Sequence, residues 1–366
     1  MLNIKDAETE YLLTLMRCAL KEEQVPAPPE SLNWKRLIQI SKKQQIYSML
    51  IPVIDLKLLP EEQAQELNSY SKSELVRMIA VQNMLASIEE TLGENKIKYM
   101  LLKGSVIRNY YPKQSMRQMT DIDILYDPAE RERLISLMKA KGFYLKSAEA
   151  NSDDFFKNPY YNFEFHRNLF DERDDFCPNF DLWKRAVQSE DSSCKYLINK
   201  EDCFIYSLCH TFDHYCVSGC GIRFVADIYV LINKLDNLDF DYINKTVEDF
   251  GFADFCKNVI GLSKVIFDGK APTTEEQNLF DFMISGGVYG NNDFSKAIEE
   301  SGSKFKYLIK RIFPPKRQML GNYPMLQRAP FLLPFYYIFR LIQRAYYNFG
   351  SIKKELKSLK SYHPED

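Results

Sequence analysis

Apolar residues recur with helical spacing along residues 1–95. The segments 6–23 and 33–50 each place apolar side chains three and four positions apart, and a proline-rich connector at 26–30 separates them. A longer segment, 66–96, continues the same pattern and predicts a long helix. The pattern therefore predicts an N-terminal helical region.

Between residues 96 and 190 the pattern changes to short strands that alternate with short helices. The runs that predict strands lie at 97–103, 121–126 and 158–168. Helical patterns lie at 106–111 and 128–143. After residue 190, helical spacing returns and continues to the end of the chain. We therefore expect an α+β, mostly helical fold, in which a small mixed β-sheet within 96–190 is flanked by helical regions at 1–95 and 191–366.

Composition indicates a folded protein with a large core. The chain has 366 residues, of which 45% are hydrophobic and 14% aromatic. The net charge of −2 gives no electrostatic case for non-specific nucleic-acid binding. The N-terminus is polar and acidic, unlike a signal peptide, and no apolar run approaches the roughly 20 residues of a transmembrane helix. The eight cysteines lack a disulfide-scaffold pattern, so we expect a cytoplasmic protein.

Two carboxylates, Asp121 and Asp123, lie on either side of Ile122 in the predicted strand 121–126. Side chains alternate along a strand, so both aspartates should lie on the same face of the sheet. Neighbouring carboxylates repel unless water or a cation lies between them. Because Mg²⁺ prefers carboxylate and phosphate oxygens, the pair predicts either a solvated strand end or a site for Mg²⁺ or Mn²⁺.

Upstream of this pair, the turn Lys103-Gly104-Ser105 follows a predicted strand. Gly104 would let the backbone approach a phosphate closely, and the amides of the next helix are anion donors. Ser105 adds a hydroxyl group, and Lys103 could add a charge. Glu164, on the strand at 158–168, is the best candidate for a third carboxylate that completes a metal site and orients an attacking hydroxyl. Lys103 and Glu164 could also be exposed strand residues with no such role.

Together these motifs resemble the polymerase-β-like nucleotidyltransferase superfamily and, more narrowly, a bacterial family described only as uncharacterised nucleotidyltransferases. The resemblance extends along most of the chain, through an acidic-x-His strand, a His…His…Arg…Asp helical stretch within 209–231, and the segment 311–340. It implies a nucleotidyltransferase core at 96–190 and metal-dependent transfer of a nucleoside monophosphate from ATP or another NTP to an acceptor hydroxyl, with release of pyrophosphate. The implied site residues are Asp121, Asp123 and Glu164 for catalysis and metal binding, Lys103, Gly104, Ser105 and Arg117 for nucleotide binding, and His166, His210, His214, Arg223 and Asp227 for the lining of the cleft.

Other functions stay open at this point. One is a catalytically silent module that binds a nucleotide or a partner, and another is a helical adaptor stabilised by zinc. The zinc ligands would be His210, His214, Cys216 and Cys220, although their spacing is not that of a zinc finger. Arg223 and Asp227, four residues apart, could instead form a structural helix pair, and Arg117 could pair with the two aspartates.

The acceptor also stays open: a small molecule, a protein side chain or an RNA end. Basic, aromatic segments at 304–317 and 340–360 would suit a nucleic acid or an anionic membrane surface. We favour the plainer interpretation, helices whose aromatic side chains pack into a core while their charges stay in water. Prolines at 314, 315, 324, 330 and 334 would interrupt any long amphipathic helix.

Overall fold

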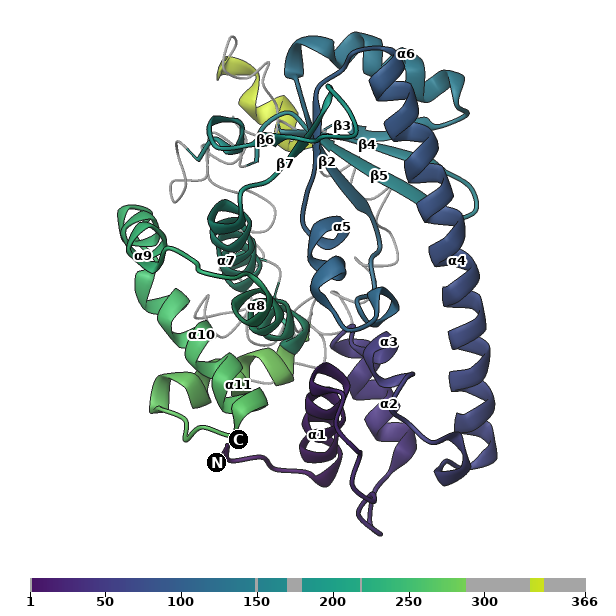
Figure 1. Cartoon of the computed structure of the whole chain (residues 1–366), viewed down its shortest axis with the longest axis vertical. Coiled ribbons are helices and arrows are strands. Elements are labelled where there is room, and N and C mark those ends of the chain that lie inside the picture. Colours follow the sequence, from purple (N-terminus) through teal and green to yellow (C-terminus); the bar gives the residue numbers. More distant parts are fainter. Residues whose placement is uncertain (1, 149–150, 170–179, 218, 288–329, 339–366) are drawn as a thin grey trace. The chain divides into compact units, whose positions relative to one another are not determined.

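The structure is a computed structural model (Figure 1) that describes residues 2–148, 151–169, 180–217, 219–287 and 330–338. The chain forms two compact units, residues 1–290 and 291–366, and almost all described residues belong to the first. The basic, aromatic segments 304–317 and 340–360 lie outside the described residues. In the described part of the chain, no helix is both long and apolar enough to cross a membrane.

The predicted N-terminal helices are confirmed. They are α1 (Ala7–Lys21), α2 (Trp34–Lys43), α3 (Tyr47–Leu50) and α4 (Glu61–Glu94). Side chains cap the first two: Asp6 accepts a hydrogen bond from the Thr9 amide and Asn33 accepts one from the Arg36 amide. The long helix α4 begins directly after Pro60, five residues before the predicted segment.

A mixed seven-stranded sheet forms the centre of the fold, as predicted, with the order β3-β4-β5-β2-β1-β7-β6. The strands are β1 (Tyr99–Leu101), β2 (Ile122–Tyr126), β3 (Tyr144–Ala148), β4 (Ser152–Lys157), β5 (Tyr161–His166), β6 (Val187–Gln188) and β7 (Lys195–Leu197). Strand β1 is parallel to β7, and β2 is parallel to β5, while the other neighbours are antiparallel. Short helices α5 (Gly104–Ile107) and α6 (Arg131–Ala140) follow β1 and β2.

The strands β3, β4, β6 and β7 were not expected from the sequence, and β7 lies after residue 190, where helical spacing was expected. For β4 and its partner β3, buried charge explains the difference. Asp153 lies inside β4 and is 0% exposed. Its carboxylate accepts hydrogen bonds from Arg131 at 2.7 and 2.8 Å and also pairs with Arg167. Aspartate is depleted in strands, so the local sequence does not predict one where a tertiary ion pair makes burial possible.

The two faces of the sheet are covered by different helices. On one face, Val81, Ile88 and Leu92 of α4 pack with Ile122 and Phe163 in a buried cluster, and Figure 1 shows α4 passing alongside the sheet. On the other face, Met100, Leu125 and Tyr206 pack together, and Tyr206 belongs to α7. The described C-terminal helices are α7 (Lys200–Val217), α8 (Ile222–Lys234), α9 (Phe240–Asp249), α10 (Ala253–Asp268) and α11 (Thr274–Gly286).

The register of β2 and β5 positions the acidic residues. Asp123 is the direct partner of Glu164 in this parallel pair, and Ile122 is the partner of Phe163. Since Ile122 faces α4, alternation directs Asp123 and Glu164 to the opposite face, toward α7. The sheet therefore brings two of the predicted carboxylates together over a sequence separation of about forty residues.

Candidate functional site

The predicted carboxylates line a cavity of about 190 Å³ beside the turn that precedes α5. Helices α7 and α8 contribute the residues that face them. The lining residues are Gln45, Lys103, Gly104, Arg117, Met119, Thr120, Asp121, Asp123, Glu164, His210, His214 and Arg223. Most of the predicted site residues therefore meet in one place, although they come from widely separated parts of the sequence.

Asp123 is the most strongly held carboxylate of the cavity. Its Oδ1 atom lies 2.7 Å from Nζ of Lys103 and 2.9 Å from Nε2 of His166. Although burial acts to raise the pKa of Asp123, Lys103 and His166 hold it below its usual value. Burial likewise opposes the charge of Lys103, but Asp123 raises the pKa of the lysine well above its usual value. The two groups form a buried ion pair.

Asp121 differs from its neighbour because no cation pairs with it in the described part of the chain. Its carboxylate accepts a hydrogen bond from Oγ1 of Thr120 at 3.3 Å. Burial and the charge of Asp123 raise the pKa of Asp121. The predicted repulsion therefore raises the pKa of Asp121, whereas Lys103 and His166 compensate the charge of Asp123.

Glu164 completes the acidic cluster. It is half-buried, and its carboxylate lies 3.5 Å from Nε2 of His166. Burial raises the pKa of Glu164. Ligand atoms of Asp123, Glu164 and His166 all lie within 4.8 Å of one another.

Carboxylate oxygens suit Mg²⁺ as well as Mn²⁺, and Nε2 of His166 is engaged with Asp123. Asp121, which no ion pair holds in the described part of the chain, lines the same cavity but does not belong to this cluster. The donor set therefore fits a divalent cation. Among the described residues, Cys216 and Cys220 belong to no such cluster, and Cys220 is buried whereas Cys216 is exposed. Nothing in this part of the chain supports the zinc site.

Lys103 has an unusual backbone conformation, and Gly104 has unusually close neighbours. Lys103 has φ 45° and ψ −123°, in a region that side chains with a Cβ rarely occupy. A Cβ atom on Gly104 would lie 2.6 Å from Nη1 of Arg117 and 2.8 Å from Sδ of Met119. Glycine is therefore required at 104 by these two side chains.

Arg117 and Asp227 form a second buried ion pair. Nε and Nη2 of Arg117 donate to the two oxygens of Asp227 at 2.9 and 2.8 Å, and the Tyr111 hydroxyl lies 2.7 Å from Oδ1. Asp227 does not line the cavity. The alternatives considered for Arg117 and Arg223 therefore do not occur: Arg117 pairs with neither Asp121 nor Asp123, and Arg223 is not the partner of Asp227.

Two imidazoles on α7 lie beside Arg223 in the wall that faces the carboxylates. The rings of His210 and His214 are 4.5 Å apart and nearly perpendicular, and both contact Phe224. Burial and the charge of Lys103 lower the pKa of His210 well below its usual value. Burial and Arg223 lower the pKa of His214 to about 4. Both imidazoles are therefore neutral at neutral pH.

Ser105 lies in an adjoining cavity of about 190 Å³, on the side of the sheet covered by α4, and not in the main cavity. Arg108 shares this second cavity. The Oγ atom of Ser105 and the Nε atom of Arg108 are buried and have no hydrogen-bond partner among the described residues. The exposed fractions of the two residues are 7% and 5%. Two buried donors without acceptors are costly, and together they suit an anion.

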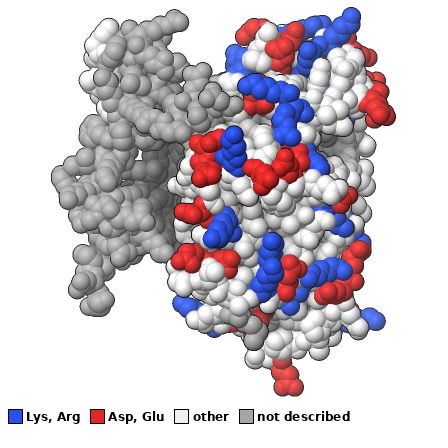
Figure 2. Space-filling model, turned by 60° about the vertical axis from the view of Figure 1, so that its left-hand side comes forward, with Lys and Arg blue, Asp and Glu red and all other residues white. Residues whose placement is uncertain are grey.

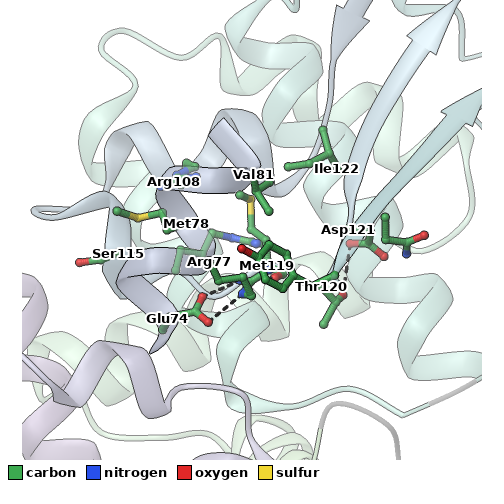
Figure 3. Close-up of a pocket in the computed structure, with 13 residues that line it drawn as sticks. Glu74, Arg77, Met78, Val81, Arg108, Ser115, Met119, Thr120, Asp121 and Ile122 are labelled. Carbon is green, nitrogen blue, oxygen red and sulfur yellow. Dashed lines mark hydrogen bonds and ion pairs between the residues drawn. The ribbon is translucent and has the colours of Figure 1, made fainter. Parts of the chain in front are cut away.

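A small pocket joins the surroundings of Arg108 to those of Asp121 (Figure 3). Glu74 lines it but is already paired with Arg77 at 2.5 Å, which leaves Arg108 without a counter-charge in the described part of the chain. Burial and the nearby Arg117 lower the pKa of Arg108. No sequence motif assigned a role to Arg108, although its position three residues after Ser105, on the same helical turn, was an available signal.

Comparison with known proteins gives one match to a family and one to a solved structure. A family model described as an uncharacterised nucleotidyltransferase matches residues 30–268. No curated protein matches the chain. The solution structure of the antibiotic-resistance factor ANT(2'')-Ia aligns with a TM-score of 0.34 and 11% sequence identity, over 49% of this chain and 93% of that one.

Proposed function

The chain belongs to the uncharacterised nucleotidyltransferase family, and we propose that it transfers a nucleoside monophosphate from a nucleoside triphosphate to an acceptor hydroxyl in a metal-dependent reaction. The observation that carries this proposal is the grouping of Asp121, Asp123 and Glu164 in one cavity beside the turn at Lys103 and Gly104. Clustered carboxylates are costly unless a cation or a proton compensates them. In a phosphoryl-transfer site, such a cluster binds the metal ions that stabilise the charge of the reacting phosphate.

In the proposed reaction, the acceptor oxygen forms a bond to the α-phosphorus of the NTP. The bond between this phosphorus and the oxygen that bridges to the β-phosphorus breaks, and pyrophosphate leaves with the electron pair. The proton of the acceptor hydroxyl passes to the carboxylate of Glu164. Burial raises the pKa of Glu164, which makes it a stronger base than an exposed carboxylate.

The three carboxylates Asp121, Asp123 and Glu164 would hold Mg²⁺ or Mn²⁺, which when bound neutralises phosphate charge at the reacting centre. His166 donates toward Asp123 and lies near Glu164, so it fixes the orientation of both carboxylates. Lys103 compensates the charge of Asp123 before substrate arrives.

For the triphosphate, we place the outer phosphates toward α5. Gly104 lines the main cavity, and Ser105 and Arg108 in the adjoining cavity have buried polar atoms without partners. A guanidinium and a hydroxyl are suitable donors for phosphate oxygens. Both oxygens of Asp227 accept hydrogen bonds from the Arg117 guanidinium, which also lies against Gly104. Arg117 therefore has little freedom to bind phosphate.

The decisive experiment is incubation of the purified protein with Mg²⁺ and each of the four NTPs labelled at the α-phosphate. Transfer would appear as pyrophosphate release and as label on protein, RNA or small molecules from an extract. Glu164→Gln, which keeps the side-chain size but removes the base, should lower the rate by roughly 10²–10⁴ fold. Nucleotide binding without any transfer would indicate the silent binding module, and undiminished transfer by Glu164→Gln would remove this residue from the mechanism.

A further inference from the structure

Arg223 is a cation of the main cavity that lacks a carboxylate partner. Its guanidinium donates to Oε1 of Gln45 and lies 5.1 Å from the centre of the Phe224 ring. Its Nε atom is buried and has no acceptor among the residues that the structure describes. The nearest acidic residue along α8, Asp227, is occupied by Arg117 and Tyr111. Within the described chain, Arg223 therefore forms no ion pair, and the carboxylates of Asp227 and Asp121 act on its charge only from beyond ion-pair distance.

Such an arrangement is costly for an apo protein. A buried or half-buried charge is usually paired, and an unsatisfied donor loses its hydrogen bond to water without replacement. Burial and the nearby Arg117 lower the pKa of Arg223, yet an arginine side chain keeps its proton in proteins. The cost would be recovered if an anionic group of a ligand occupied the space beside Nε.

The neighbours of Arg223 define the kind of ligand group that fits. His210 and His214 line the same wall, and both are neutral at neutral pH because burial lowers their pKa values. The wall therefore has one net positive charge and two uncharged polar rings. A carboxylate or a phosphate matches this wall, whereas an ammonium group beside Arg223 would be repelled.

The triphosphate already has binding groups on another wall. Ser105 and Arg108 line the cavity next to α5, and neither Arg223 nor the two histidines line that cavity. The carboxylates Asp121, Asp123 and Glu164, where the α-phosphate would react, lie in the wall that faces the α7–α8 wall. The remaining anion-binding group, Arg223, is thus available to the second substrate.

We infer that Arg223 binds an anionic group of the acceptor, so that the acceptor is a hydroxyl compound carrying a carboxylate or a phosphate. This inference rests on the proposed function and adds the chemical class of its second substrate. The anionic group is held at Arg223 while the acceptor hydroxyl is directed toward Glu164 and the α-phosphorus. The bonds formed and broken are those of the proposed transfer.

The test uses the full-length protein as wild type, Arg223→Gln and Arg223→Lys, with Arg133→Gln as a matched control at an exposed arginine outside the cavity. The first arm titrates each protein with Mg²⁺ and the non-reacting α,β-methylene analogues of the four NTPs. We expect Arg223→Gln to bind the preferred analogue within about twofold of wild type, because the residue does not contact the nucleotide.

The second arm adds acceptor probes to the analogue-saturated proteins and follows binding by calorimetry. The probes are glycerol, glycerate, glycerol 3-phosphate and 2-amino-1,3-propanediol, each of which carries at least two hydroxyls, and they differ in charge. We expect an anionic probe to bind wild type and Arg133→Gln, to bind Arg223→Gln at least tenfold more weakly, and to recover part of its affinity in Arg223→Lys. The neutral and cationic probes should bind weakly and equally to all variants.

The possible outcomes separate the two proposals. If wild type binds no analogue, the proposed function fails and the inference fails with it. If wild type binds an analogue but Arg223→Gln binds it at least tenfold more weakly, Arg223 is a nucleotide-binding residue. Only the inference is then overturned. The inference alone is also overturned if no anionic probe binds wild type, or if the anionic probes bind wild type and Arg223→Gln with equal affinity.

Discussion

At the scale of single residues, the two aspartates that flank Ile122 have opposite electrostatic environments. Asp123 is paired with Lys103 and His166, whereas Asp121 accepts from the Thr120 hydroxyl and faces a neighbouring negative charge. A symmetric repulsion, as the sequence suggests, would make either aspartate dispensable for folding. The structure assigns a stabilising role to Asp123 alone.

We therefore predict opposite effects of two matched substitutions in metal-free buffer. Asp123→Asn should lower the free energy of unfolding by about 3 kcal/mol, because it leaves the buried ammonium of Lys103 without its counter-charge. Asp121→Asn should leave it unchanged or raise it by up to roughly 1 kcal/mol, because it removes a repelled carboxylate. Denaturant unfolding of both variants in the presence of a chelator measures their free energies of unfolding. Equal decreases in the two variants would contradict the prediction.

The effect at Asp121 should also depend on pH. Burial and Asp123 raise the pKa of Asp121 in the folded state, so the native protein binds its proton more tightly than the unfolded chain does. The destabilisation by Asp121 is then full above the folded pKa and disappears as pH falls toward the unfolded value of about 3.9. The stability gap between Asp121→Asn and wild type should close over this acidic range, and a gap that is constant with pH would refute the assignment.

Arg108 allows a prediction that separates ligand binding from folding. Because its buried guanidinium has no partner in the described chain, Arg108→Gln should cost no more than about 1 kcal/mol of apo stability. The same change should weaken binding of a Mg²⁺-NTP by tenfold or more if Arg108 contacts a phosphate. Calorimetric titration measures the affinity, with Arg133→Gln as the exposed control. A large loss of stability with unchanged affinity would make Arg108 a structural residue.

At the scale of elements, the ion pair between Arg117 and Asp227 joins α8 to the segment that leads into β2. Both side chains are buried, and the bond is bidentate. Arg117 also lies against Gly104, where any Cβ would collide with it. The pair therefore holds the turn before α5 at a fixed position relative to α8.

Asp227→Asn should accordingly act on folding. We expect it to lower the free energy of unfolding by about 3 kcal/mol, since one partner of a buried ion pair is left charged. The exposed pair of Arg133 and Glu130 provides the control, because Glu130→Gln should change stability by less than about 0.5 kcal/mol. Thermal and denaturant unfolding measure both. If Asp227→Asn were as stable as wild type yet inactive, a direct role in the reaction would replace the structural one.

At the scale of the whole molecule, acidic and basic side chains are interspersed on the face shown in Figure 2, in agreement with the net charge of −2. The main cavity lies where the sheet meets helices α7 and α8, which belong to a second buried cluster together with α1 and α2. A ligand in this cavity contacts residues of the sheet and residues of α7 and α8 at once.

Binding of a Mg²⁺-NTP should therefore stabilise the first unit as a whole. At a ligand concentration one hundred times the dissociation constant, the expected gain is about 2.7 kcal/mol. Thermal unfolding with ATP, GTP, CTP and UTP, each with Mg²⁺, would reveal the preferred base as the largest shift. Absence of a shift with all four nucleotides would count against nucleotide binding at this site.

Much of the fold was predictable because its signals are local. Each helix or strand buries one face, so the spacing of its apolar residues reveals its type. This local signal predicted the helices before α4 and after residue 190, and the strands β2 and β5. The hairpin of β3 and β4 was not predictable, since Asp153 is tolerated there only through Arg131 and Arg167 on other elements. The unit boundary near residue 290 had no counterpart in the sequence pattern.

The sequence by itself determined the chemistry that is available: an acidic pair on one strand face, a third carboxylate, and a lysine–glycine–serine turn. Residue type and short-range spacing are enough for this, because alternation along a strand decides which side chains share a face. Only the tertiary structure decided which acidic side chain pairs with which basic side chain. Lys103 compensates Asp123, Arg117 is bound by Asp227, and in the described part of the chain Arg108 and Arg223 form no ion pair with a carboxylate. The reason is that the energy of a charge depends on its burial and on partners within a few ångströms, and strand register and helix packing bring those partners from distant parts of the chain.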